Sequence, residues 1–155
     1  MRRPTRYDPE FGACPSEASE QERVVTWWRI YAPEMGIHPN LLWHCPNGGQ
    51  RNPVEGAHFK RLGVVAGVPD LFIAVPVGKF HGLFVEMKRR INRHTATAIQ
   101  KEQMLLLEKR GYCTLICHGA DAAIQGIEAY LSGGTTKPIN GLERVSVDRG
   151  GVQLL

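Results

Sequence analysis

The strongest hydrophobic pattern in the chain lies between residues 67 and 89, GVPDLFIAVPVGKFHGLFVEMKR. Two apolar runs, residues 71–77 and 82–88, flank a short connection that contains Gly78, and they predict two antiparallel β-strands. Because side chains alternate between the faces of a sheet, Glu86 and Lys88 share one face with Phe84. The residues on the opposite face are apolar: Leu83, Val85 and Met87.

A helix is predicted before this hairpin. Ser19 and Glu22 fit an S-x-x-E capping box, which predicts a helix from Glu20 onward. Its apolar stripe follows helical spacing and comprises Val24, Trp27, Trp28 and Tyr31. These tryptophans are expected in the core rather than as stacking platforms for bases. Glu20 lies one turn before the stripe and on its side, whereas Glu17 and Glu22 are explained by the helix dipole alone.

The remaining segments alternate between strand and helix patterns. Strands are predicted at residues 41–45 and 112–118, and helices at residues 54–63 and 120–131. Thr95 or Thr97 is expected to cap a further helix that reaches residue 110, where Gly111 ends it. A strand–turn–strand pattern surrounds residues 149–151. We therefore expect an α/β fold, with an N-terminal arm over residues 1–15, one domain over 16–132 and an extension over 133–155.

Composition narrows the classes of protein. The chain has 155 residues, 43% of them hydrophobic, and a formal net charge of +4. No apolar run approaches the roughly 18 residues that span a bilayer, and the arginines at the N-terminus precede no hydrophobic region, so a cytoplasmic protein is expected. The basic excess favours a polyanionic partner such as nucleic acid. The four cysteines form no C-x-x-C pair, and Cys113 and Cys117 are expected to be buried free thiols.

The hairpin carries the candidate chemistry. An antiparallel register brings Asp70 beside Glu86, where the two carboxylates repel each other unless a cation lies between them. Oxygen ligands suit Mg²⁺ or Mn²⁺, and Lys88 is placed to orient a water there. An isolated motif of this kind is more often a turn and a solvated edge strand. The continuous apolar run over residues 71–75 favours the functional interpretation, because charges on a strand buried on both faces need a partner.

Other segments predict auxiliary roles. Gln100 shares a helical stripe with Met104 and therefore points toward the sheet, where it would hold water or orient Lys88; a capping role is the alternative. Glu20 is a candidate third acid. Candidate DNA contacts occur in a glycine turn, in the short basic helix and after the second strand of the hairpin: Asn47, Gly48, Gly49, Arg51, Lys60, Arg61, Arg89 and Arg90. An ordinary turn and a solvated surface explain these equally well.

The segments SEQERVVTWW, PNGGQR, AGVPDLF and HGLFVEMK, followed by Gln100 eleven residues before Gly111, together resemble the small stand-alone VRR-NUC nucleases of the PD-(D/E)XK superfamily. Many members of this family are encoded by phages. The resemblance covers residues 19–131 and implies a restriction-endonuclease-like α-β-β-β-α-β core that uses Mg²⁺ or Mn²⁺.

The resemblance also implies roles for single residues. Asp70 and Glu86 match the metal-binding acids, with the backbone carbonyl of Met87 as a further ligand. Lys88 matches the catalytic lysine of the family. Glu20 matches the acid of its first helix, and Gln100 matches its helical glutamine. Stand-alone members resemble homodimeric endonucleases that cut branched DNA, such as Holliday junctions or flaps. The alternatives are a branched-DNA-binding module that no longer cuts and a sequence-specific restriction enzyme, which would need a longer recognition segment.

Overall fold

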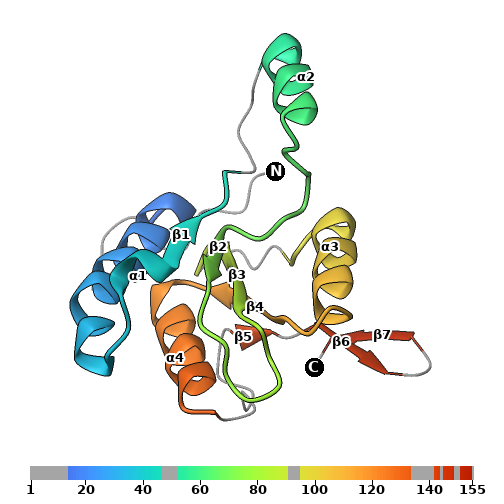
Figure 1. Cartoon of the computed structure of the whole chain (residues 1–155). Coiled ribbons are helices and arrows are strands. Elements are labelled where there is room, and N and C mark those ends of the chain that lie inside the picture. Colours follow the sequence, from blue (N-terminus) through green and yellow to red (C-terminus); the bar gives the residue numbers. More distant parts are fainter. Residues whose placement is uncertain are drawn as a thin grey trace.

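The computed structural model describes residues 14–46, 52–90 and 95–133, together with the backbone of three short strands between residues 142 and 154. A mixed five-stranded sheet in the order β1-β2-β3-β4-β5 forms the centre (Figure 1). Its strands are β1 (Leu42–His44), β2 (Leu71–Ile73), β3 (Leu83–Lys88), β4 (Cys113–His118) and β5 (Leu142–Glu143). A separate antiparallel hairpin consists of β6 (Val145–Asp148) and β7 (Gly151–Leu154), as the pattern around residues 149–151 predicts.

The register of the sheet sets Asp70 opposite Glu86. Strands β1, β2 and β3 are antiparallel to one another, and β3 runs parallel to β4. Leu71 pairs with Val85, so one further step along the same register brings the two acids to adjacent positions on one face. The predicted first strand is too long. It ends at Ile73, because Pro76 offers no N–H to the ladder and Val77 forms only an isolated bridge with Phe80.

Helices cover both faces of the sheet. They are α1 (Glu17–Tyr31), α2 (Pro53–Arg61), α3 (Ala98–Glu108) and α4 (Ala120–Leu131), with short 3₁₀ turns at Pro33–Met35 and Pro39–Leu41. Figure 1 shows α1 and α4 on one side of the sheet, α3 on the other, and α2 standing away from it at the top. The order α1, β1 to β3, α3 and β4 is the expected α-β-β-β-α-β core, with α2 inserted between β1 and β2.

Alternation along β3 divides the interior into two cores. Leu83, Val85 and Met87 are fully buried against Val24 and Trp28 of α1 and against α4. The opposite face has a smaller core, made by Ala96, Met104 and Ile116. Glu86 and Lys88 therefore point toward α3, as the period of two predicts. Cys113 and Cys117 are free and buried, also as predicted.

The first helix begins one turn earlier than the predicted capping box. Ser16 is the N-cap, and its hydroxyl accepts a hydrogen bond from the backbone N–H of Ser19 at 3.1 Å. The prediction that Ser19 caps the helix is wrong, because a capped extra turn reaching back to Ser16 is available to the chain. Glu17 consequently occupies the first position of α1. In the described part of the chain, no helix combines the length and apolarity needed to cross a membrane.

Candidate active site

Asp70 is held at the start of β2 by contacts with its neighbours on both sides. Its carboxylate oxygen Oδ2 accepts the backbone N–H of Met87 at 2.8 Å. Its backbone carbonyl accepts the N–H of Cys45 at 2.7 Å and lies 2.8 Å from Nδ1 of His44. The side chain is thus directed toward β3 beyond the end of the β2–β3 ladder, where it faces Glu86.

Glu86, Lys88 and Gln100 form a connected polar group under α3. Nζ of Lys88 donates to Oε1 of Glu86 at 2.7 Å and to Oε1 of Gln100 at 3.2 Å. Nε2 of Gln100 donates to the same Glu86 oxygen. Glu86 is 1% exposed and Lys88 8% exposed, so these contacts are shielded from water. The lysine is therefore held beside the carboxylate.

Gln100 has the capping role and the site role at once. Thr97 is the N-cap of α3, with its hydroxyl accepting from the N–H of Gln100, while Oε1 of Gln100 accepts the N–H of Thr97 at 2.8 Å. This capping box orients the amide, because its oxygen already faces two donors and its nitrogen must face an acceptor. The acceptor is Glu86, so one side chain joins the N-terminus of α3 to β3.

Burial raises the pKa of both acids, and a neighbouring negative charge raises that of Glu86 further. Burial is the largest cause that raises the pKa of Glu86 to about 7, and the nearby Asp70 charge raises it further, against the lowering effect of Lys88. Burial also raises the pKa of Asp70, partly offset by the Met87 N–H bond and by Lys88. Acids whose pKa values are perturbed by burial and by each other are typical of functional sites.

The donor set fits a hard divalent cation. Oε2 of Glu86 is buried and has no hydrogen-bond partner among the described residues. The Met87 carbonyl points to the same edge of β3 as its N–H, which is bound to Asp70. Within residues 14–46, 52–90 and 95–133, no group of three or more His, Cys, Asp or Glu side chains is placed to hold a metal. Two carboxylates and a carbonyl suffice for Mg²⁺, which keeps several waters and takes phosphate oxygens.

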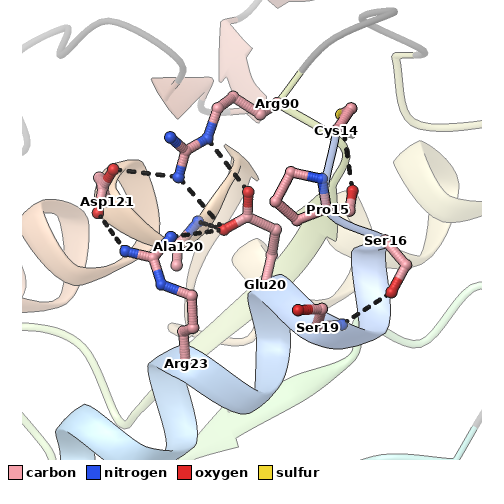
Figure 2. Close-up of polar contacts among 9 residues, drawn as sticks. All are labelled: Cys14, Pro15, Ser16, Ser19, Glu20, Arg23, Arg90, Ala120 and Asp121. Atoms are coloured by element: carbon pink, nitrogen blue, oxygen red, sulfur yellow. Dashed lines mark hydrogen bonds and ion pairs between the residues drawn. The ribbon is translucent and has the colours of Figure 1, made fainter. Parts of the chain in front are cut away.

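Glu20 is fully buried and is bound by a different group of residues (Figure 2). Oε1 accepts Nε of Arg90 at 3.1 Å, and Oε2 accepts Nη1 of Arg23 at 3.0 Å and the N–H of Ala120 at 2.9 Å. Both arginines also reach Asp121, at 3.1 Å each. Because both oxygens of Glu20 are occupied, the carboxylate is a weaker candidate for a metal ligand than its position on the helix predicts.

Glu17 is an exposed acid of the first helix with a small electrostatic influence on Glu86. Its charge contributes to the raised pKa of Glu86. Its position in the first turn follows from the cap at Ser16, and that serine is the sequence signal that would have identified it.

Gly67 is a second residue whose role emerges only in the structure. Its φ is +86°, and a Cβ there would lie 2.7 Å from the carbonyl oxygen of Ile99 in the first turn of α3. Only glycine allows this close approach. The segment that leads to Asp70 is thereby placed against the helix that carries Gln100.

The predicted DNA contacts fall into three groups. Lys60 and Arg61 are exposed in the last turn of α2, which has no buried residue. Arg89 is exposed after β3, whereas the guanidinium of Arg90 is engaged by Glu20 and Asp121. The remaining four predicted contacts, residues 47–49 and 51, lie outside the described residues.

The fold and this arrangement of side chains define a class. A mixed sheet in α-β-β-β-α-β order, with an acid before β2 and Glu-x-Lys on β3, is a restriction-endonuclease-like nuclease fold. A solved structure described as a "VRR_NUC domain protein" is similar to this chain, with 34% identity and a TM-score of 0.67. The match covers 79% of this chain and 93% of the other. The chain therefore belongs to the VRR-NUC family.

The two other comparisons add no relative. Scanned against models of protein families, the chain matches none, and a search of curated proteins finds no match.

Proposed function

We propose that this protein is a metal-dependent endonuclease that hydrolyses phosphodiester bonds in branched DNA. The observation that carries the proposal is Oε2 of Glu86, a buried carboxylate oxygen without a hydrogen-bond partner among the described residues. A buried, unsatisfied acid is costly, and the charge of Asp70 adds to that cost. A divalent cation between the two acids removes both penalties.

Asp70, Glu86 and the Met87 carbonyl are the groups that would hold Mg²⁺ or Mn²⁺. When bound, such an ion supplies electrostatic stabilisation to a reacting phosphate and makes a coordinated water more acidic. The sheet fixes the backbones of Asp70 and Glu86, and the Asp70 side chain is further tied to β3 through the Met87 N–H. The two acids therefore have little freedom to move apart.

Lys88 orients the reacting groups. Its ammonium carries three N–H donors, and the contacts with Glu86 and Gln100 use two of them. The third is available for a water or a phosphate oxygen beside Glu86. Gln100 keeps the lysine in this position, because the capping box with Thr97 holds the amide from the other side.

Of the three acids of α1, we assign different roles to Glu17 and Glu20. Glu17, at the first position of the helix, would complete the acidic group around Glu86. Glu20 would serve as a positioning residue that ties the start of α1 to the end of β3 through Arg90 and to α4 through Ala120. In this way Glu20 supports the site without touching the metal.

DNA contacts are proposed around this centre. The exposed basic residues Lys60, Arg61 and Arg89 suit phosphate groups, and residues 47–49 and 51 remain candidates from the sequence. Preference for branched DNA rests on the resemblance to the stand-alone VRR-NUC nucleases. A homodimer would present two such sites to a roughly symmetric junction, and the extension over 133–155, which contains the β6–β7 hairpin, is the proposed interface.

The test is a panel of DNA substrates digested with Mg²⁺, with Mn²⁺ and with a chelator. Four-way junctions and flaps are compared with random duplex, using the wild-type protein, Asp70→Ala, Lys88→Ala and the control Lys79→Ala, which changes an exposed lysine of the hairpin turn. We expect metal-dependent cutting of branched DNA by the wild type and the control. Asp70→Ala and Lys88→Ala should still bind DNA but not cut it.

Three outcomes contradict the proposal. Binding of junctions without cleavage under any metal condition indicates a module that has lost catalysis. Cutting of random duplex at one fixed sequence indicates a restriction enzyme. Metal-dependent cutting by folded Asp70→Ala refutes the assignment of the site.

A further inference from the structure

A strip of aromatic side chains crosses the sheet next to the two acids. The aromatic strip, as we name it, consists of Trp43, Phe72, Phe84 and Tyr112. Trp43 pairs with Phe72 and Phe72 with Phe84 in the register of β1, β2 and β3. Ring centroids lie 4.9 Å apart for the first pair, 4.4 Å for the second and 5.5 Å between Phe84 and Tyr112. The strip runs from the sheet edge at β1 toward the centre.

The aromatic strip belongs to neither hydrophobic core of the described residues. The large core contains Leu71, Ile73, Leu83 and Val85, which alternate with the strip residues and point to the α1 and α4 side. The small core under α3 contains Met104 and Ile116 but no ring of the strip. Phe72, Phe84 and Tyr112 are half-buried, and Trp43 at the free end is 46% exposed. A large indole is thus left facing solvent.

Trp43 lies on the same face as the acids, in the row two residues along the ladder from them. The row Trp43, Phe72, Phe84 adjoins the position at which Asp70 stands opposite Glu86. Two residues along a strand span about 6.7 Å and neighbouring strands lie about 4.8 Å apart, so the Trp43 backbone is roughly 8 Å from that of Asp70. That separation is on the scale of one nucleotide along a bound strand.

We propose that Trp43 is a stacking platform for an unpaired nucleobase next to the scissile phosphate, an inference that rests on the proposed nuclease function. Aromatic side chains bind single-stranded nucleic acid by stacking on base faces, whatever the base. The contact with Phe72 is edge-on, with 71° between the rings, so it holds the indole in place without stacking on it. In a duplex both faces of each base are covered by neighbours, whereas an unpaired base next to a branch point, as at a flap, has a face free to stack. The platform would therefore select branched DNA.

The experiment measures binding with Ca²⁺ in place of Mg²⁺, and so does not depend on cleavage. A flap substrate carries the fluorescent base 2-aminopurine at the unpaired position next to the branch. Wild type, Trp43→Ala and Trp43→Phe are compared with Ile30→Ala, a control that removes another exposed apolar side chain, from α1. We expect wild type to quench the probe, Trp43→Phe to retain most of the quenching, and Trp43→Ala to lose it and bind about 10-fold more weakly. Replacing the probe by an abasic site should remove the difference between wild type and Trp43→Ala.

The outcomes separate this inference from the function on which it rests. Equal quenching and affinity for Trp43→Ala and wild type overturn the stacking role while leaving the nuclease proposal in place. Absence of any DNA binding by the wild type overturns both. A change of oligomeric state confined to Trp43→Ala, seen by light scattering, assigns the exposed ring to an interface between copies of the chain and overturns the stacking role.

Discussion

Replacing Glu20 by glutamine separates a structural role of this carboxylate from a role as a metal ligand. The side chain is fully buried, and its two oxygens accept from Arg23, Arg90 and Ala120. Glutamine keeps the shape but removes the charge, and its amide nitrogen would face guanidinium groups that only donate hydrogen bonds. At least one oxygen position of the acid would thus lose its partners.

The size of the loss of stability depends on how exposed the two arginines bound to Glu20 are. Removing one member of a buried ion pair costs about 3–5 kcal/mol when the other is left buried and unpaired. Arg23 is 45% exposed and Arg90 is 25% exposed, and both retain Asp121, so water and that acid recover part of the loss. We expect a decrease of about 2–3 kcal/mol in the free energy of unfolding. For a chain of this length, that lowers the melting temperature by roughly 5–10 °C.

The assay pairs stability with metal affinity. Thermal and urea unfolding followed by circular dichroism are measured for wild type, Glu20→Gln and the exposed control Glu22→Gln, while Mn²⁺ binding is followed by electron paramagnetic resonance. Glu20→Gln should be less stable but bind Mn²⁺ with unchanged affinity below its melting temperature. The control should change neither quantity. Glu17→Gln should show the reverse pattern, with normal stability and weaker Mn²⁺ binding.

A Glu20→Gln variant with wild-type stability and lost Mn²⁺ binding would refute this reasoning. It would show that the acid belongs to the metal site and that its ion pairs contribute little. The sequence-based assignment of Glu20 would then stand in place of the positioning role.

Three further perturbations test other contacts. The pKa of Glu86 is raised to about 7 from an ordinary 4.5, so the metal-free protein should lose on the order of 3 kcal/mol of stability as the pH rises from below 4.5 through 7. In the presence of a chelator, the free energy of unfolding of Glu86→Gln should depend less on pH than that of the wild type. Gly67→Ala places a Cβ against Ile99 at a φ of +86°, so unfolding should become easier by about 1–3 kcal/mol, as measured by urea denaturation; an unchanged midpoint contradicts the close approach. Thr97→Val removes the hydroxyl that accepts the backbone N–H of Gln100 and should cost about 1 kcal/mol, with slower cleavage because the first turn of α3, which carries Gln100, is held less firmly although the Thr97 N–H still binds its side chain; normal kcat in a destabilised variant would show that the hydroxyl cap does not position the glutamine.

Local sequence patterns determined much of this protein. Period-two alternation places Glu86 and Lys88 on one face, and the short hairpin brings Asp70 opposite Glu86, since neither depends on distant residues. The α4 bounds likewise follow from helical spacing, whereas turn chemistry left Thr95 and Thr97 as alternative caps of α3. The start of α1 was predicted one turn too late, because Ser16 and Ser19 are both acceptable caps and local rules do not choose between them.

Only the tertiary structure decided which acids belong together. Glu20 meets Arg90 and Ala120, partners 70 and 100 residues away, so its role could not be read from its helical stripe. Gln100 is both cap and site residue because packing of α3 on β3 brings its amide to Glu86. The sequence places Trp43 only in a short predicted strand, and the register of the sheet brings it within two residues along the ladder of Asp70. Spacing along a chain sets which face a side chain occupies, but the partners on that face come from segments that meet only when the sheet and its helices pack.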